Sequence, residues 1–301
     1  MNTIEFIGDN VICYQSVAPL HIREYYNYCV TLLLKKLSEL KGPINVIFGR
    51  IPHTFNNTNP TIKIDIQCEH TVVKDGGRGV NKIVLGNTLT ENGERYLVRV
   101  SDFNYFNNLD VVIEYSIPNI THIRNSGHFN DYTSKLTYIA SLVYDVEFIS
   151  TNRKNTITLF TNNVSDRRNL FTNNVLKNSV SCTNVDGCYG GTELREQYDK
   201  TKILVNVHQT DHHHTFEELR VLPALSRGVI VISEDVPLKE EIPYGEYIIW
   251  SSYDNLLTTI KDVQDNYDIY HKRVFNNNLK NLLLKMRDIN NDNLNILKKY
   301  E

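Results

Sequence analysis

Apolar and amphipathic segments alternate along the second half of the chain. Runs rich in β-branched residues predict strands at 156–161, 179–182, 203–207, 229–233 and 247–250. Segments with apolar residues at helical spacing predict helices at 166–176, 193–198, 216–227 and 254–267. Strands and helices in this succession pair in parallel through right-handed crossovers, so we expect a parallel α/β sheet.

The first half has the same character with fewer helices. Its apolar runs predict strands at 3–6, 11–14, 44–48, 61–66, 82–85, 96–100 and 110–113, and 22–40 has helical spacing. The stretch 150–155 is polar and lacks a core pattern, which predicts two domains, residues 1–150 and 151–301. The final segment, 274–300, has a helical pattern, and we expect it to return to the first domain.

The composition favours a small-molecule ligand. The 301 residues carry a formal net charge of −3 without a long basic or acidic run, so we expect neither nucleic acid nor an anionic membrane surface as a partner. No apolar stretch approaches the roughly 18 residues of a membrane span, and the N-terminus lacks a signal-peptide pattern. These features predict a cytoplasmic protein.

Cysteine and histidine do not form a metal-binding pattern. The five cysteines are scattered without a Cys-x-x-Cys pair, so we expect reduced, mostly buried thiols. Three adjacent histidines at 212–214 cannot all point at one ion. We therefore expect no metal site.

A strand, a loop, a helix and a second strand between Lys202 and Glu234 predict a crevice that faces a helix N-terminus. Thr215 and Glu218 have the Thr-x-x-Glu spacing of a capping box. The remaining free amides and the positive end of the helix favour a phosphate just before Thr215. The alternative is a well-capped helix without a ligand.

Glu217 and Arg220 are predicted to share one face of that helix. There a carboxylate can accept hydrogen bonds from sugar hydroxyls, and a guanidinium can fork onto an oxyanion. An intrahelical salt bridge is the alternative. Pro223 removes a helical hydrogen bond, which predicts a kink.

Further basic residues lie where strands end or loops enter helices. These are Arg167, Arg168, Lys202 and His208. Two arginines and a lysine that converge on a diphosphate would neutralise a leaving group, so we expect the first three to meet in the crevice. Each one alone is also typical of ordinary surface charge.

Glu69 and His70 are the acid/base candidates of the first half. They follow the predicted strand 61–66, and a carboxylate next to an imidazole at a strand end can face an interdomain cleft. A structural histidine is the alternative for His70.

Both halves contain short motifs of a known family. These are Asn206-Val-His208, Glu217-x-x-Arg220, Gly228, Ser233-Glu234, Glu114-Tyr-Ser116, Pro118-Asn119 and Ser165-Asp-Arg-Arg168. With these residues the chain resembles glycosyltransferases with the GT-B fold, including forms found in large DNA viruses, and the similarity covers about half of the chain. The resemblance implies two Rossmann-like domains that face a cleft. It also implies a nucleoside-diphosphate sugar bound by the C-terminal domain, a glycan or other hydroxyl acceptor against the N-terminal domain, and no metal or other cofactor. A viral member would act in the host cytoplasm.

The resemblance implies a role for each candidate residue. The leaving diphosphate would be stabilised by Arg167, Arg168, Lys202 and the helix start at Thr215, with His208, Glu218 and Arg220 as further donor-binding residues. Sugar or ribose hydroxyls would be held by Glu217 and Glu234. Glu69 or His70 would serve as the base if the reaction inverts.

The chain departs from the family pattern at one point. Many retaining members have two glutamates that flank the donor, and alignment on Gly228 places Thr215 and Pro223 at those positions. The stereochemical outcome therefore stays open. Two other functions also stay open, a sugar-nucleotide or glycan-binding protein without catalysis and a two-domain sugar-nucleotide epimerase.

Overall fold

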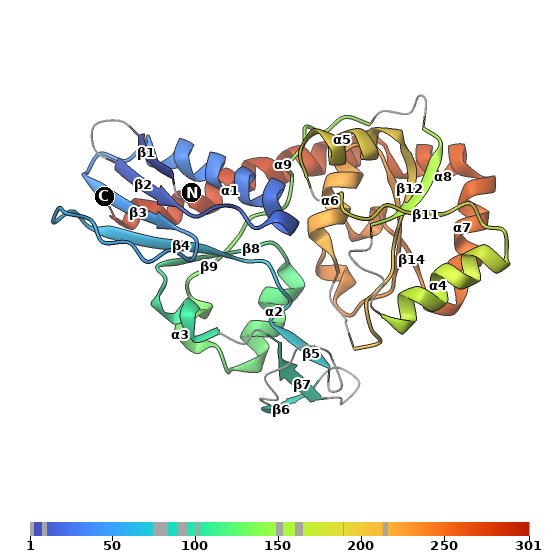
Figure 1. Cartoon of the computed structure of the whole chain (residues 1–301), viewed down its shortest axis with the longest axis horizontal. Coiled ribbons are helices and arrows are strands. Elements are labelled where there is room, and N and C mark those ends of the chain that lie inside the picture. Colours follow the sequence, from blue (N-terminus) through green and yellow to red (C-terminus); the bar gives the residue numbers. More distant parts are fainter. Residues whose placement is uncertain are drawn as a thin grey trace.

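The computed structural model describes residues 3–7, 11–74, 84–89, 95–99, 103–148, 153–159, 165–188, 190–212 and 216–300. Within these ranges the chain forms two α/β units, each built around its own largely parallel sheet (Figure 1). The predicted fold class, with two Rossmann-like sheets, is confirmed.

The sheet of the first unit has six strands in the order β1-β2-β3-β4-β8-β9. Only β1 runs antiparallel to its neighbour, and the other pairs are parallel. The strands are β1 (Thr3–Ile7), β2 (Val11–Gln15), β3 (Ile44–Phe48), β4 (Thr61–Gln67), β8 (Val111–Glu114) and β9 (Leu136–Tyr138). Because parallel strands end at the same edge, the residues that follow β4 and β8 lie close together.

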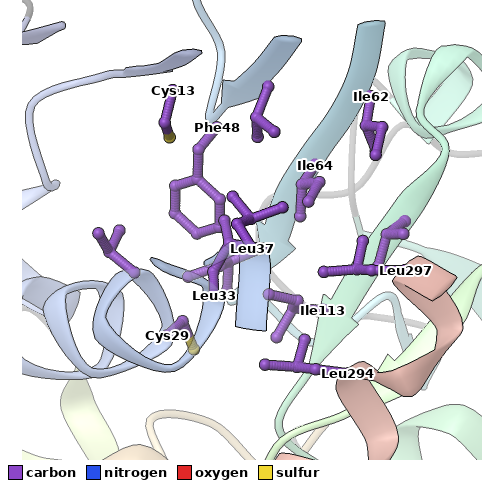
Figure 2. Packing of buried hydrophobic residues seen from close by; sticks show 14 of the residues in the cluster. Cys13, Cys29, Leu33, Leu37, Phe48, Ile62, Ile64, Ile113, Leu294 and Leu297 are labelled. Carbon is purple, nitrogen blue, oxygen red and sulfur yellow. The ribbon is translucent and has the colours of Figure 1, made fainter. Parts of the chain in front are cut away.

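One face of this sheet is covered by α1 (Arg23–Leu37), which follows the short helix η1 (Leu20–Ile22). Leu33 and Leu37 of α1 pack with Phe48 and Ile64 of the sheet, and all four side chains are buried (Figure 2). Burial of side chains of this size contributes about 2 kcal/mol each. The apolar stripe of α1 therefore fixes the helix on this face.

The other face packs against α2 (Ile117–Ser126), α3 (Asn130–Thr133) and the short helix η2 (Phe103–Asn108). Val112 of β8 belongs to this second cluster, whereas its neighbours Val111 and Ile113 belong to the cluster around α1. This alternation is the two-residue period of a strand covered on both faces. A small antiparallel sheet of β5 (Val72–Lys74), β7 (Arg95–Val98) and β6 (Val84–Leu89) lies beyond α2 (Figure 1).

The sequence analysis did not predict α2. The helix starts after Ser116, whose hydroxyl accepts a hydrogen bond from the Asn119 amide, and Pro118 lies in its first turn. It ends at Gly127, which has the left-handed φ of 64° that suits a glycine at a helix C-terminus. The capping residues were readable, but the helix between them is short and rich in asparagine and β-branched residues.

The second sheet has five parallel strands in the order β11-β10-β12-β13-β14. They are β10 (Asn155–Thr158), β11 (Thr183–Asn184), β12 (Thr201–Asn206), β13 (Ile230–Glu234) and β14 (Ile249–Ser251). The predicted strand at 179–182 was wrong. Ser179 has a left-handed φ of 52°, and the Val180 amide donates to the Val175 carbonyl at 3.0 Å, so these residues form the turn that closes the preceding helix.

Helices cover both faces of the second sheet. They are α4 (Asp166–Lys177), α5 (Gly191–Lys200), α6 (Glu218–Ser226), α7 (Leu256–Asp265) and α8 (Tyr267–Val274), with short helices η3 (Lys239–Glu241), η4 (Gly245–Tyr247) and η5 (Tyr253–Asn255) between β13 and α7. Leu204 and Val231 pack with α5 and α6, whereas Ile203 and Ile230 pack with α4 and α7.

The end of the chain joins the two units. Helix α9 (Asn277–Asn293) packs Leu283 and Met286 into the second unit, and η6 (Leu294–Tyr300) places Leu294 and Leu297 in the core beneath α1 (Figure 2). In Figure 1, α9 extends from the second unit toward α1, and the C-terminus lies beside the first sheet. The predicted return of the terminal helix to the first domain is confirmed.

Candidate functional site

A cavity of about 370 Å³ lies between the two sheets and is called the central cavity below. Its walls come from η1, the start of α1 and the loops after β4, β7 and β8 of the first unit, and from α4, α5 and α6 of the second. The loops after β4 and β8 and the start of α4 follow the carboxyl ends of parallel strands, the edge at which open α/β sheets bind ligands. Both units therefore present their ligand-binding edge to one space.

The wall from the first unit carries the two acid/base candidates, Glu69 and His70. Glu69 forms an ion pair with Arg99, with Oε2 and Nη2 3.0 Å apart. The His70 imidazole is 3% exposed, and its Nδ1 lies 3.5 Å from the hydroxyl of Tyr115, which also lines the cavity. Carboxylate, guanidinium, imidazole and phenol thus meet on one wall.

The wall from the second unit carries Arg168, Glu217 and Arg220. Arg168 lies in the first turn of α4, where the hydroxyl of Ser165 accepts a hydrogen bond from its amide. The Arg168 guanidinium donates to the Val207 carbonyl from Nε at 3.2 Å and from Nη2 at 3.0 Å. Burial and the nearby charge of Arg220 lower the pKa of Arg168 to about 10.

Arg220 reaches the cavity from α6. Its Nη2 lies 3.6 Å from Oε2 of Glu217, and its Nη1 is buried without a hydrogen-bond partner among the described residues. Two guanidinium groups, Arg168 and Arg220, therefore stand with a single carboxylate, Glu217, on this wall of the cavity. The cavity as a whole is lined by three arginines and three glutamates, so the positive charge is concentrated on this wall. Together with the N–H donor of Arg220 it suits an anionic ligand.

Arg167, His208 and Glu234 form a cluster beside the cavity rather than in its lining. Glu234 ends β13, and its buried carboxylate accepts a hydrogen bond from the His208 amide at 2.6 Å and another from Arg167. Arg167 also pairs with Asp211, and its guanidinium lies 3.9 Å from the centre of the Tyr253 ring. Burial lowers the pKa of His208, which favours a neutral imidazole.

Lys202 does not join the other predicted phosphate ligands. It is the second residue of β12, so it lies at the amino end of the strand, away from the edge that faces the cavity. Its ammonium group lies 4.6 Å from the centre of the Tyr267 ring. Sequence analysis placed Lys202 beside a strand end, but the strand begins there.

Helix α6 does not begin with the predicted capping box. Thr215 lies outside the described residues, and the helix begins at Glu218 with Glu217 at the N-cap. The Glu218 carboxyl group does not turn back to the helix amides, because it is buried and accepts a hydrogen bond from the Tyr244 hydroxyl at 2.8 Å. Burial raises the pKa of Glu218 to about 7. Pro223 lies inside the helix and also lines the cavity.

Tyr115 and Arg99 are site residues that sequence analysis did not identify. Tyr115 follows β8, the direct neighbour of β4, so its position at a strand end was a readable signal. Arg99 follows β7 of the small sheet, and nothing in its local sequence points to Glu69. Both Arg99 and Glu69 also line a second cavity of about 610 Å³ at the edge of the first sheet.

The described residues contain no cluster of three or more histidine, cysteine or acidic side chains arranged to hold a metal ion. The five cysteines are not paired in disulfides. Cys68 lines both cavities, and burial raises the pKa of its thiol to about 12. Among the helices in the described ranges, none is long and apolar enough to cross a membrane.

The chain has sequence similarity to a viral protein. No protein-family model matches the chain. An uncharacterized protein of Acanthamoeba polyphaga mimivirus is 26% identical over 251 residues, which is 81% of this chain and 79% of the viral protein. The chain is thus similar over most of its length to a protein of a large DNA virus whose name states no activity.

Proposed function

We propose that the protein is a glycosyltransferase of the GT-B type, which moves a sugar from a nucleoside diphosphate to a hydroxyl group of a glycan or other acceptor. The observation that carries the proposal is the composition of the central cavity. The first unit contributes acid/base side chains to its lining, and the second unit contributes two arginines. Inverting transfer of a sugar from a diphosphate uses both kinds of residue, a base for the acceptor hydroxyl and cationic groups for the leaving diphosphate.

The donor binds by its diphosphate to Arg168 and Arg220. A guanidinium forks onto phosphate oxygens with two parallel hydrogen bonds, and the buried Nη1 of Arg220 supplies a donor that has no partner among the described residues. A bound dianion would also offset the repulsion between the two guanidinium groups. Glu217, whose side chain is 29% exposed, then accepts hydrogen bonds from hydroxyls of the sugar.

The acceptor hydroxyl oxygen forms a bond with the anomeric carbon, and the bond from that carbon to the diphosphate oxygen breaks. The nucleoside diphosphate leaves with the electron pair, and Arg168 and Arg220 stabilise the charge that grows on it. The proton of the acceptor hydroxyl goes to His70. Glu69 is the less available of the two, because its carboxylate is engaged in an ion pair with Arg99.

This assignment makes the reaction inverting. In this proposal the base comes from the first unit and the diphosphate ligands come from the second. The acceptor oxygen therefore approaches the anomeric carbon from the side away from the leaving group, which exchanges the configuration there. Closure of the cavity around both substrates limits hydrolysis of the donor by water.

The proposal is tested by incubating the protein with a panel of nucleoside-diphosphate sugars and carbohydrate acceptors. Release of nucleoside diphosphate that depends on the acceptor, together with a glycosylated product, is expected. Binding of a sugar nucleotide, seen as a thermal shift, without turnover would indicate a non-catalytic binding protein. Conversion of the sugar without nucleotide release would indicate an epimerase. Absence of binding to every member of the panel would contradict the proposal.

A further inference from the structure

A network of buried polar side chains lies behind the wall that carries His70 and Tyr115. Its members are Gln67, Thr71, Glu114, Ser116 and Asn119, and all five are at most 2% exposed. They come from the end of β4 and the loop after it, the end of β8 and the start of α2. Burial of so many polar groups is costly unless each is hydrogen-bonded, so their arrangement calls for a reason.

Glu114 sets the path of the chain that leads to Tyr115. It is the last residue of β8 and is fully buried. Its Oε1 accepts hydrogen bonds from the amides of Tyr115 at 3.0 Å and Ser116 at 3.1 Å. Its Oε2 accepts a hydrogen bond of 2.7 Å from the side-chain amide of Asn119.

Asn119 connects this carboxylate to the His70 loop. Its Oδ1 accepts a hydrogen bond from the Thr71 backbone amide at 3.2 Å, and its Nδ2 lies 3.3 Å from the Thr71 hydroxyl. The buried side-chain amide of Asn119 therefore contacts both Thr71, which follows His70, and the carboxylate of Glu114, which accepts a hydrogen bond from the Tyr115 amide.

The other side of His70 is held in the same way. The side-chain amide of Gln67 donates to the Glu69 carbonyl at 2.8 Å and to the Thr71 hydroxyl at 3.0 Å. Both residues next to His70 are thus fixed by buried side chains, in a loop that has no strand or helix to hold it. The contact between the imidazole and the phenol depends on this support rather than on the sheet alone.

We infer that Glu114 and Asn119 are positioning residues, which hold the His70 imidazole against the Tyr115 hydroxyl at the wall of the central cavity. The catalytic part of this inference rests on the proposed function, but the placement of the imidazole does not. Neither residue lines the cavity, so each acts through the groups it holds. A purely structural role for the network would leave the environment of His70 unchanged when the network is rearranged without unfolding.

The test exchanges the hydrogen-bond donor at position 119 and the acceptor at position 114. In Asn119→Asp, the amide that donates the 2.7 Å hydrogen bond to Glu114 becomes a carboxyl group, which keeps this bond only by taking up a proton. The two groups repel each other once both are ionised, so the measurements are made at alkaline pH. In the Asn119→Asp/Glu114→Gln double variant the donor and the acceptor trade places and the bond is restored. Thr71→Val removes the hydroxyl shared by Gln67 and Asn119 with little change in volume, and serves if Asn119→Asp does not fold.

Two measurements are made on the wild-type protein and each variant. The first is the ¹⁵N and ¹H resonances of the His70 imidazole without substrate, identified by their loss in His70→Gln. The second is kcat and KM for sugar transfer. Asn290→Asp is the matched control, because Asn290 is also fully buried and also hydrogen-bonds backbone groups, those of Ala140 at 2.8 and 2.9 Å, away from the central cavity.

Asn119→Asp is expected to shift or broaden the His70 resonances. It is also expected to lower kcat by roughly 10- to 100-fold with little change in KM, since misplacing a reacting group by about 1 Å has an effect of this size. The double variant should recover both, and Asn290→Asp should change neither. Unchanged His70 resonances in Asn119→Asp and Thr71→Val would overturn the inference. Shifted resonances in a protein that transfers no sugar would refute the proposed function and leave the inference standing.

Discussion

The hydroxyl of Tyr244 donates a hydrogen bond of 2.8 Å to the carboxyl group of Glu218, and both side chains are buried. Burial raises the pKa of Glu218 from 4.5 to about 7, so between these values the folded protein binds more protons than the unfolded chain. The contribution of Glu218 to stability is therefore greatest below pH 4.5 and is lost as the pH rises through 7.

We accordingly expect Glu218→Gln to be more stable than the wild-type protein at pH 8, by up to about 3 kcal/mol, with the difference shrinking toward pH 5. Urea unfolding of both proteins at several pH values measures this. Glu240→Gln, at an exposed position, is the control. Parallel stability curves for wild type and Glu218→Gln would contradict the expected protonation of Glu218.

The two arginines of the cavity should determine donor affinity. Arg220→Gln is expected to weaken nucleoside-diphosphate binding about 10- to 100-fold, because a hydrogen bond to a charged group contributes roughly 1.5–3 kcal/mol. Isothermal titration calorimetry with a nucleoside diphosphate measures the change. Lys202→Gln removes the same charge at the opposite edge of the sheet and should bind as the wild type does. Equal affinity of the wild-type protein, Arg220→Gln and Lys202→Gln would show that the diphosphate does not contact Arg220.

The two candidate bases can be separated by substitution. His70→Gln is expected to lower kcat by roughly 100-fold or more, the usual contribution of a general base. Glu69→Gln should have the smaller effect, since its carboxylate is already paired with Arg99. Initial rates at saturating donor and acceptor give kcat for both variants. A larger loss in Glu69→Gln than in His70→Gln would reverse the assignment.

Gly49 should tolerate no side chain. It follows β3 with a φ of 88°, and a Cβ there would overlap the Ser16 hydroxyl and come within 3.0 Å of the Tyr26 hydroxyl. Gly49→Ala is expected to destabilise the protein by about 1–3 kcal/mol, as left-handed strain of this kind does. Gly42→Ala, where a Cβ would meet open space, is the control. Thermal unfolding of the two variants compares them, and equal melting temperatures would show that the turn relaxes.

The sequence predicted those parts of the fold and site that follow from local pattern. Strand β3 spans the residues that were predicted for it, because its five buried positions have the pattern of a strand inside a sheet. Glu69, His70 and Arg168 reach the central cavity because they follow the carboxyl ends of parallel strands, and both sheets present that edge to the cavity. The same rule, applied to the start of β12 rather than its end, excludes Lys202 from that edge.

Other parts of the site depend on contacts that local sequence does not contain. Thr71 and Asn119 are separated by 48 residues, and their hydrogen bonds exist only because β4 and β8 are neighbours in the sheet. Glu218 has the spacing of a capping residue, but its carboxyl group goes to Tyr244, which lies 26 residues later. In both cases tertiary packing determines the hydrogen-bond partner, and the local sequence does not favour one partner over another.

Leu294 and Leu297, near the end of the chain, complete the core beneath α1, while Leu279 and Leu283 of the preceding helix complete a core of the second unit. A ribosome-bound chain therefore cannot close the core of its first sheet until Leu297 has left the ribosome. Both units then finish packing around one continuous terminal segment. Folding of the two halves is coupled in time, and loss of that segment would open both hydrophobic cores together.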